Sequence, residues 1–135
     1  MPARFRSTLP LLVLVLLGAC AENRWLPLSG QTIQAEMFGK TALGTDAGGG
    51  NWTMWIAPDG KAVFRGSNGN GTELVDNGTA RIDGDSLCVQ WQKMHADEPF
   101  CQVIYTDRGL SYRAYSPDLT LNSHFTLVPG NPDKL

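Results

Sequence analysis

Side chains that carry catalysis or bind metal ions are scarce in this sequence. It contains two histidines and three cysteines, which is a thin supply of ligands for a tetrahedral zinc site. It also lacks the Gly-x-Ser-x-Gly, His-Glu-x-x-His and Walker motifs that mark common hydrolases and nucleotide-binding proteins. Paired acids such as Asp83 and Asp85 stand in turns, where carboxylates are usually solvated. We therefore predict a protein that is not an enzyme and that carries no metal or cofactor.

Long apolar runs are also missing. The apolar stretch at residues 9–17 is far shorter than the roughly 20 residues that a membrane-spanning helix needs. It follows Arg4 and Arg6 and precedes a run of small residues, which is the layout of a secretory signal peptide. The sequence therefore predicts export and no transmembrane helix.

The signal ends in Leu17, Gly18, Ala19 and Cys20, and these four residues resemble the lipobox of bacterial lipoproteins. The resemblance implies cleavage after residue 19, diacylation of the Cys20 thiol and acylation of its new amino group, a combination that holds a protein stably on a membrane. Ala21 follows, where Asp would favour inner-membrane retention, so the resemblance implies the periplasmic face of the outer membrane. The alternative is an ordinary signal peptide that is cleaved before a cysteine.

Positive charge is in short supply. Removal of residues 1–19 takes Arg4 and Arg6 with it and leaves nine basic residues against 13 acidic ones. Such a surface argues against nucleic acid or anionic lipid as a partner, because both are met with clustered Lys and Arg. The remaining length suits one domain, and we assign residues 20–30 to a lipidated tether and residues 31–135 to the domain.

Helical periodicity is absent from this domain over more than a turn or two. Clusters of Gly, Asn and Asp interrupt the chain about every 8 to 12 residues, a rhythm typical of antiparallel all-β proteins. We expect flexible loops at residues 44–50 and 66–71. The expected strands are residues 31–38, 51–57, 61–65, 72–75, 79–83, 86–92, 99–106, 110–115 and 124–128.

A meander of so many short strands would leave exposed edges unless the sheet closed on itself. We therefore predict a small, closed, eight-stranded, calycin-like antiparallel β-barrel. Eight strands give an interior just wide enough to be filled by side chains or to hold one small ligand.

The stretch LCVQWQKMHADEPFC, residues 87–101, offers a metal site, a thiol nucleophile or a disulfide. Exported thiols tend to be oxidised, and a lipid on Cys20 would leave Cys88 and Cys101 as a pair. A turn around residues 93–97 would place the two on neighbouring antiparallel strands, at the Cα spacing of about 5.5 Å that suits a disulfide. We predict the Cys88–Cys101 disulfide, with His95 as a solvated residue at the hairpin tip; a pH-sensing or ligand-binding role for His95 is the alternative.

Aromatic side chains are the strongest candidates for binding. Trp52 and Trp55 lie three apart on one expected strand, so they point to opposite faces. If Leu87 lies inside, Val89, Trp91, Phe100, Gln102 and Ile104 share its side of the sheet, and Cys88 and Gln90 face out. We predict that a ligand-binding or partner-binding patch is drawn from Trp55, Trp91, Tyr105, Tyr112 and Tyr115; the alternative is that most of these fill the core.

From Trp55 onward the sequence resembles an uncharacterised family of small exported domains and lipoproteins of Gram-negative bacteria. The residues that carry the resemblance are Ala57-Pro58-Asp59-Gly60, Asp76-Asn77-Gly78, Gly84-Asp85-Ser86-Leu87-Cys88 with Trp91, then Cys101 and Gly130-Asn131-Pro132. Members usually carry an aromatic residue where Ala80 stands and often one where Gln102 stands. The resemblance implies a stress- or envelope-related periplasmic β-domain and supplies no catalytic residue.

These observations favour a non-enzymatic binding module, anchored to the membrane by its N-terminal lipid, for a small apolar ligand or an envelope protein. The alternative is a protein inhibitor of periplasmic or host hydrolases, of the protease or lysozyme type. In that case residues 66–71 or 94–99 would form the inhibitory loop. Hydrolase activity is a third possibility, but no motif supports it.

Overall fold

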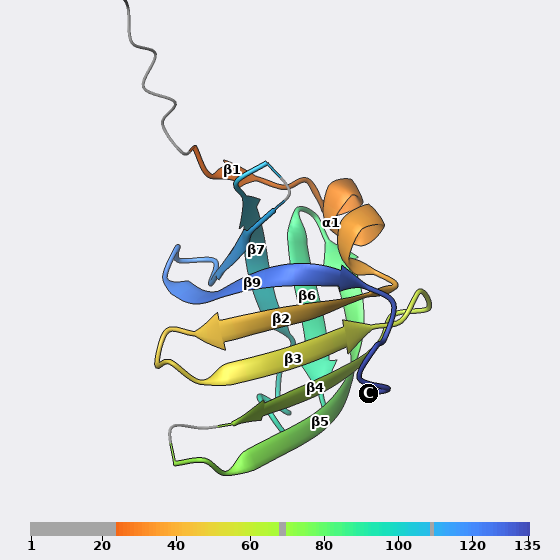
Figure 1. Cartoon of the computed structure of the whole chain (residues 1–135). Helices are drawn as coiled ribbons and strands as arrows, with labels where there is room; N and C mark the ends of the chain where they lie inside the picture. The colour runs from red at the N-terminus through yellow and green to blue at the C-terminus, as the bar shows by residue number, and fades with distance from the viewer. Residues whose placement is uncertain (1–23, 68–69, 109) are drawn as a thin grey trace, which may run out of the picture.

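The chain folds into a closed, eight-stranded antiparallel β-barrel with one short helix (Figure 1). The computed structural model describes residues 24–67, 70–108 and 110–135. The helix is α1, Gly30–Met37. The strands are β1 (Leu26–Pro27), β2 (Lys40–Asp46), β3 (Asn51–Ile56), β4 (Lys61–Ser67), β5 (Glu73–Asp83), β6 (Ser86–Trp91), β7 (Phe100–Thr106), β8 (Tyr112–Tyr115) and β9 (Leu121–Pro129).

Strands β2 to β9 form the barrel, and within this set every strand pairs with the next one in the chain, including β7 with β8 and β8 with β9. The pairing of β9 with β2 closes the ring. The two-residue β1 adds to the last part of β7, next to the segment that β6 covers. The predicted barrel is confirmed, and so is the predicted disulfide, with an S–S distance of 2.07 Å between directly opposed residues of β6 and β7.

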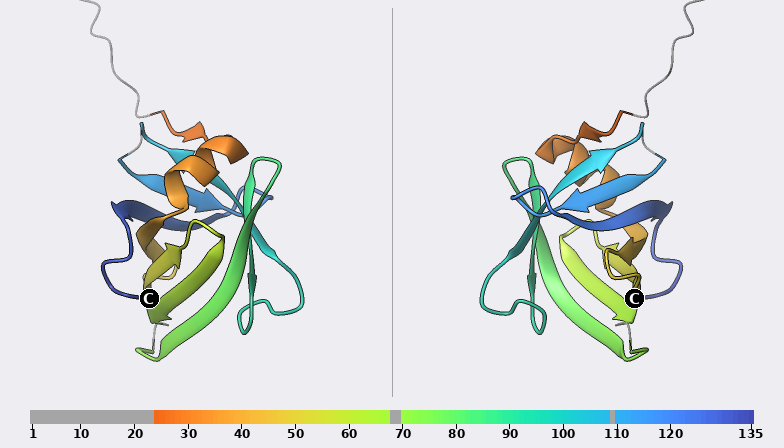
Figure 2. Two further views of the ribbon diagram at one scale, coloured as in Figure 1. Left: turned by 90° about the vertical axis from the view of Figure 1, so that its right-hand side faces the viewer. Right: turned by 90° about the vertical axis from the view of Figure 1, so that its left-hand side faces the viewer.

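Helix α1 closes one end of the barrel (Figure 2). Ser29 caps its N-terminus by accepting the backbone N–H of Thr32. Ile33 and Met37, one turn apart, point into the same core as the small inward residues Ala42, Ala62 and Ala80. We call this the closed end; the connections β2–β3, β6–β7 and β8–β9 lie at the other, open end.

The prediction of a strand at residues 31–38 is wrong. Ile33, Ala35 and Met37 alternate as strand residues would, but the Ser29 cap and the i, i+4 pair of Ile33 and Met37 make two helical turns. This length is too short for a sustained helical pattern to stand out. The chain needs the helix here because the barrel end would otherwise expose its core.

The expected loop at residues 44–50 is confirmed only for residues 47–50, and the expected break at residues 76–78 is wrong. Strand β2 runs through Gly44 to Asp46, and β5 is one strand from Glu73 to Asp83. Asn77-Gly78 has the composition of a hairpin turn, but it lies inside β5. Gly78 is needed there because a Cβ atom would come within 2.7 Å of the Trp91 ring.

The folded region begins before the predicted boundary at residue 31. Leu26 and Pro27 pair with β7, and the Leu28 N–H donates to the Ile104 carbonyl over 2.8 Å. Most of the predicted tether that the structure describes is therefore bound to the barrel. Cys20 and the predicted signal lie outside the described residues.

Candidate functional site

A cavity of about 630 Å³ opens into the barrel from its open end. Its inner wall is apolar and comes from inward-facing positions of β3, β4, β6 and β7, whereas its rim comes from the open-end connections. The wall residues are Trp52, Met54, Phe64, Val89, Trp91, Phe100 and Gln102; the rim and upper wall residues are Asp46, Ala47, Gly48, Met94, His95, Thr120, Leu121, Asn122 and Ser123.

Five aromatic rings follow one another across the barrel interior. Trp91 meets Phe64 edge-on at 5.9 Å between ring centroids, and Phe64 stacks on Trp52 at 6.2 Å. Trp52 meets Phe125 at 5.8 Å, and Phe125 stacks on Tyr112 at 5.2 Å. Such contacts stabilise aromatic pairs beyond their buried area, so the three rings that line the cavity are held in place by their neighbours.

Two strand glycines make room for these rings. A Cβ atom on Gly44 would lie 2.3 Å from the Trp52 ring, and one on Gly78 would lie 2.6 Å from the Gln90 carbonyl oxygen as well as against Trp91. The large rings can therefore lie flat against the barrel wall. The central space stays open because the rings follow the wall.

Polar groups gather at the rim. Asp46 accepts the backbone N–H of Gly50 over 2.8 Å, and the Ser116 hydroxyl bonds to Asn122 Oδ1 over 3.0 Å. Asn122 Nδ2 is buried and has no hydrogen-bond partner among the described residues. A buried donor left without a partner costs free energy, and Asn122 is one of the residues that line the cavity.

A buried carboxylate holds one side of the mouth. Asp76 is fully buried, and its Oδ2 accepts the backbone N–H groups of Lys93 and Met94 over 2.9 and 2.8 Å. Its Oδ1 accepts the N–H of Asn77 over 2.8 Å. Burial by itself would raise the pKa of Asp76, but the backbone N–H groups of Met94, Lys93, Asn77 and Gln92 outweigh it and lower that pKa below its ordinary value.

The connection that Asp76 holds carries two residues of the mouth. Met94 lines the cavity, and His95 is exposed with its ring stacked on Phe100 at 4.9 Å. On the other side of the loop, Gln90 Nε2 donates to the Ala96 carbonyl over 3.2 Å. His95 therefore lies in the hairpin connection, as the sequence predicts, and it also borders the cavity.

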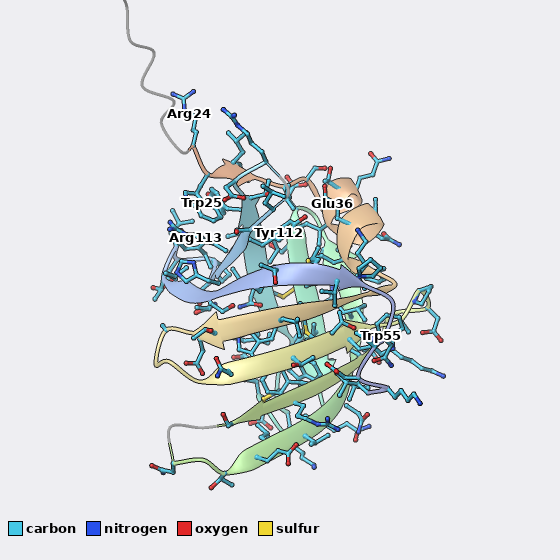
Figure 3. The ribbon with its side chains drawn as sticks, viewed as in Figure 1. Arg24, Trp25, Glu36, Trp55, Tyr112 and Arg113 are labelled. Atoms are coloured by element: carbon cyan, nitrogen blue, oxygen red, sulfur yellow. A yellow bond between two sulfur atoms is a disulfide. The ribbon has the colours of Figure 1, made fainter. Side chains whose placement is uncertain are left out.

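The five predicted aromatic residues do not form one patch. Trp91 and Tyr112 face the interior, but only Trp91 lines the cavity. Tyr112 lies toward the closed end, where its hydroxyl donates to Glu36 over 2.8 Å (Figure 3). Burial, together with that bond and the Glu36 charge, raises the pKa of Tyr112 well above its ordinary value.

The other three predicted residues lie on the outer wall. Tyr105 and Tyr115 meet edge-on at 5.1 Å, and Trp55 lies elsewhere, between Thr41 and Val63 of the neighbouring strands. Strand alternation sends these three side chains to the opposite face from Trp91, so the five residues do not share one surface, and a binding role for any of them stays a prediction. Trp52, Phe64 and Phe100 take their place, and alternation from Trp91 across the sheet was the signal that could have found them.

Other chemistry finds little support in the described part of the chain. No group of three or more His, Cys, Asp and Glu residues there lies close enough to hold a metal ion. Over the same residues, no helix has the length and apolar character that crossing a membrane requires. The fold and cavity together define a closed β-barrel with an aromatic-lined internal cavity.

No protein-family model matches the chain, and no curated protein or solved structure matches it. The resemblances to bacterial lipoproteins and to a family of exported domains stay predictions. Inferences about function therefore rest on the residues of the site.

Proposed function

We propose that this protein is a membrane-anchored periplasmic binding module that holds a small, mostly apolar ligand inside its barrel. The observation that carries the proposal is the cavity of about 630 Å³. Its size falls in the range of about 300–1,000 Å³ that is usual for small-molecule sites. Anchoring through lipidated Cys20, at the periplasmic face of the outer membrane, is part of the same proposal.

The lining favours a flat apolar body with an acceptor at one end. Trp91, Phe64 and Trp52 offer ring faces and edges for stacking, and apolar pockets with a few placed polar groups are typical of ligand sites. Asn122 at the rim would bind the acceptor by turning its Nδ2, which is covered in this structure, toward the cavity. Asp46 at the rim makes an uncharged acceptor, such as a carbonyl or ether oxygen, a better fit than a carboxylate.

A direct test is to fill the cavity. Gln102 lines the cavity from β7 and is only half-buried, so Gln102→Trp would occupy the cavity with little cost to the core. The matched control is Thr79→Trp, which places the same ring on the exposed outer face of β5. The fluorescence of N-phenyl-1-naphthylamine, a neutral apolar probe, reports binding. We expect probe affinity to fall at least tenfold in Gln102→Trp, a loss of about 1.4 kcal/mol or more of binding free energy. Probe affinity should change little in Thr79→Trp.

Near-ultraviolet circular dichroism of both variants verifies that each is folded. Native mass spectrometry of the protein, after gentle extraction from membranes, would detect a natural ligand that stays bound. Equal probe affinity in the folded wild type and the folded Gln102→Trp variant would refute binding inside the barrel.

A second function, inhibition of a hydrolase, is favoured by one observation. The connection at residues 92–99 is exposed at its tip and fixed at its base by Asp76, and a preorganised loop loses less entropy on binding. Replacement of residues 95–98 by Gly-Ser would abolish inhibition of a target protease or lysozyme. If the unmodified protein inhibits no enzyme of such a panel, this second proposal fails.

A further inference from the structure

The N-terminal segment is fixed to the outside of the barrel where the chain enters the fold. Beyond the β1–β7 pairing, Trp25 lies under the Arg113 guanidinium, whose Cζ is 4.0 Å from the ring centroid. Figure 3 shows Arg24, Trp25 and Arg113 together on this side of the molecule. Cation–π contacts of this kind hold an aromatic ring in a defined place, so Trp25 belongs to the surface of the folded domain.

Exposed apolar side chains surround this entry point. Leu26 is 48% exposed and Leu110 is 79% exposed, and Leu110 lies in the β7–β8 connection that follows Thr106, the partner of Leu26. These are two of five large apolar residues that are exposed in the described chain. We call Arg24, Trp25, Leu26, Arg108 and Leu110 the entry face.

The charge of the entry face differs from that of the whole chain. Arg24 and Arg108 are exposed, and Arg113 lies over Trp25. Two carboxylates belong to the same region: Asp107 accepts the Ser111 N–H over 2.8 Å and Glu36 accepts the Tyr112 hydroxyl. Three arginines against two carboxylates give this part of the described surface a small positive charge, although the chain as a whole is acidic. Trp and Leu beside Arg is a combination typical of surfaces that lie in the headgroup layer of a membrane.

The short stretch of chain between Cys20 and Trp25 indicates which partner covers the entry face. Cys20 and Trp25 are five residues apart, and an extended chain covers at most about 3.6 Å per residue, or about 18 Å here. A lipid on Cys20, which is part of the proposed function, would hold Trp25 within that distance of the bilayer surface.

We propose that the entry face docks on the lipid bilayer, with Trp25, Leu26 and Leu110 among the headgroups and Arg24 and Arg108 beside lipid phosphates. Phe100 at the mouth and Thr106 beside Leu26 are opposite ends of β7, about 20 Å apart at the usual rise of a strand. The docked barrel therefore opens its cavity away from the membrane.

Tryptophan quenching tests this orientation. The full-length lipidated protein is reconstituted into vesicles of phosphatidylethanolamine and phosphatidylglycerol whose acyl chains are brominated near the headgroup. Flotation of the vesicles reports anchoring, and the loss of emission relative to unbrominated vesicles reports docking. We expect a measurable loss of tryptophan emission, at most the share that one of the four tryptophans contributes.

Two variants assign the quenched residue. Trp25→Phe should abolish the quenching, whereas Trp55→Phe, which removes an outer-wall ring away from the entry face, should preserve it. Leu110→Asp should weaken the quenching while flotation is unchanged. Flotation without quenching of Trp25 would overturn the docking proposal and leave anchoring intact. Binding of a purified envelope protein to the entry face would have the same consequence. If the lipidated wild-type protein does not float with the vesicles, anchoring and docking are both overturned. Probe binding in the cavity would be unaffected by that result.

Discussion

At the scale of single residues, Asp76 shows how a local pattern can be misread. Asp-Asn-Gly is typical of a turn, yet Asp76 faces the interior, is fully buried and organises the β6–β7 connection. Sequence reasoning finds residues such as Trp91, whose side of the sheet follows from alternation. It missed Asp76 because its partners are backbone N–H groups 17 and 18 residues away, which no side-chain pattern reports.

Asp76→Asn should destabilise the protein strongly. The amide would offer one acceptor and one donor to N–H groups that need two acceptors, and hydrogen bonds to a charged group are worth about 1.5–3 kcal/mol each. We expect the free energy of unfolding in urea to fall by about 3 kcal/mol. Asp118→Asn is the control, because this exposed carboxylate accepts the Thr120 N–H in water; an equal effect of both variants would contradict the role of burial.

The same carboxylate should make stability depend on pH at the acid side. The pKa of Asp76 is lower in the folded protein than in the unfolded chain, so the unfolded state takes up protons first as the pH falls. The stabilisation is complete above the ordinary pKa of an aspartate, near pH 4, and is lost as the pH falls through the lower folded value. We therefore expect the free energy of unfolding, measured in urea between pH 6 and about pH 2, to fall less steeply with pH in Asp76→Asn than in the wild type. An equally steep fall in both proteins would place the acid sensitivity in other groups.

At the scale of elements, the errors of the sequence reading have one physical origin. The sequence predicts a strand at residues 31–38, two strands in place of β5 and none in place of β2, because propensity and turn composition are local whereas these elements are set by tertiary contacts. The nine expected strands exceed the eight of the barrel by one, because these errors only partly cancel; the eight-stranded closure itself was predicted from the need to pair the strand edges. The disulfide was predictable because the pairing of β6 and β7 follows from a single short connection.

The closure of the barrel by α1 can be tested through its buried side. Ile33→Ala would leave a void beneath the helix and should lower the free energy of unfolding by about 3 kcal/mol, because Ile33 is fully buried. Gln34→Ala, a truncation on the exposed side of the same helix, should change it little. Urea unfolding followed by tryptophan fluorescence measures both; a small effect of Ile33→Ala would mean that α1 does not contribute to the core.

At the scale of the whole molecule, closure was predictable and the cavity was not. Many short strands with exposed edges require closure, but the interior space depends on where rings lie against the wall, as Trp52 does against Gly44. Alternation assigns a side chain to the inside without saying whether it fills the centre. The candidate site therefore needed the three-dimensional arrangement of several strands.

The proposed anchoring through Cys20 is tested separately from the cavity. Cys20→Ser should abolish incorporation of labelled palmitate, because the substituted residue has no thiol to acylate. Ala21→Ser is the control that keeps the thiol. Continued labelling of Cys20→Ser would refute the lipobox interpretation.

The position of the mouth has a consequence for the kinetics of exchange. A ligand in a barrel closed by α1 would enter and leave past the same connection, the one that Asp76 holds through Lys93 and Met94. Loosening this connection would speed association and dissociation by a similar factor, so the residence time would shorten while the equilibrium affinity stayed nearly constant. The barrel wall would thus set how tightly the ligand is held, and one buried carboxylate would set how long.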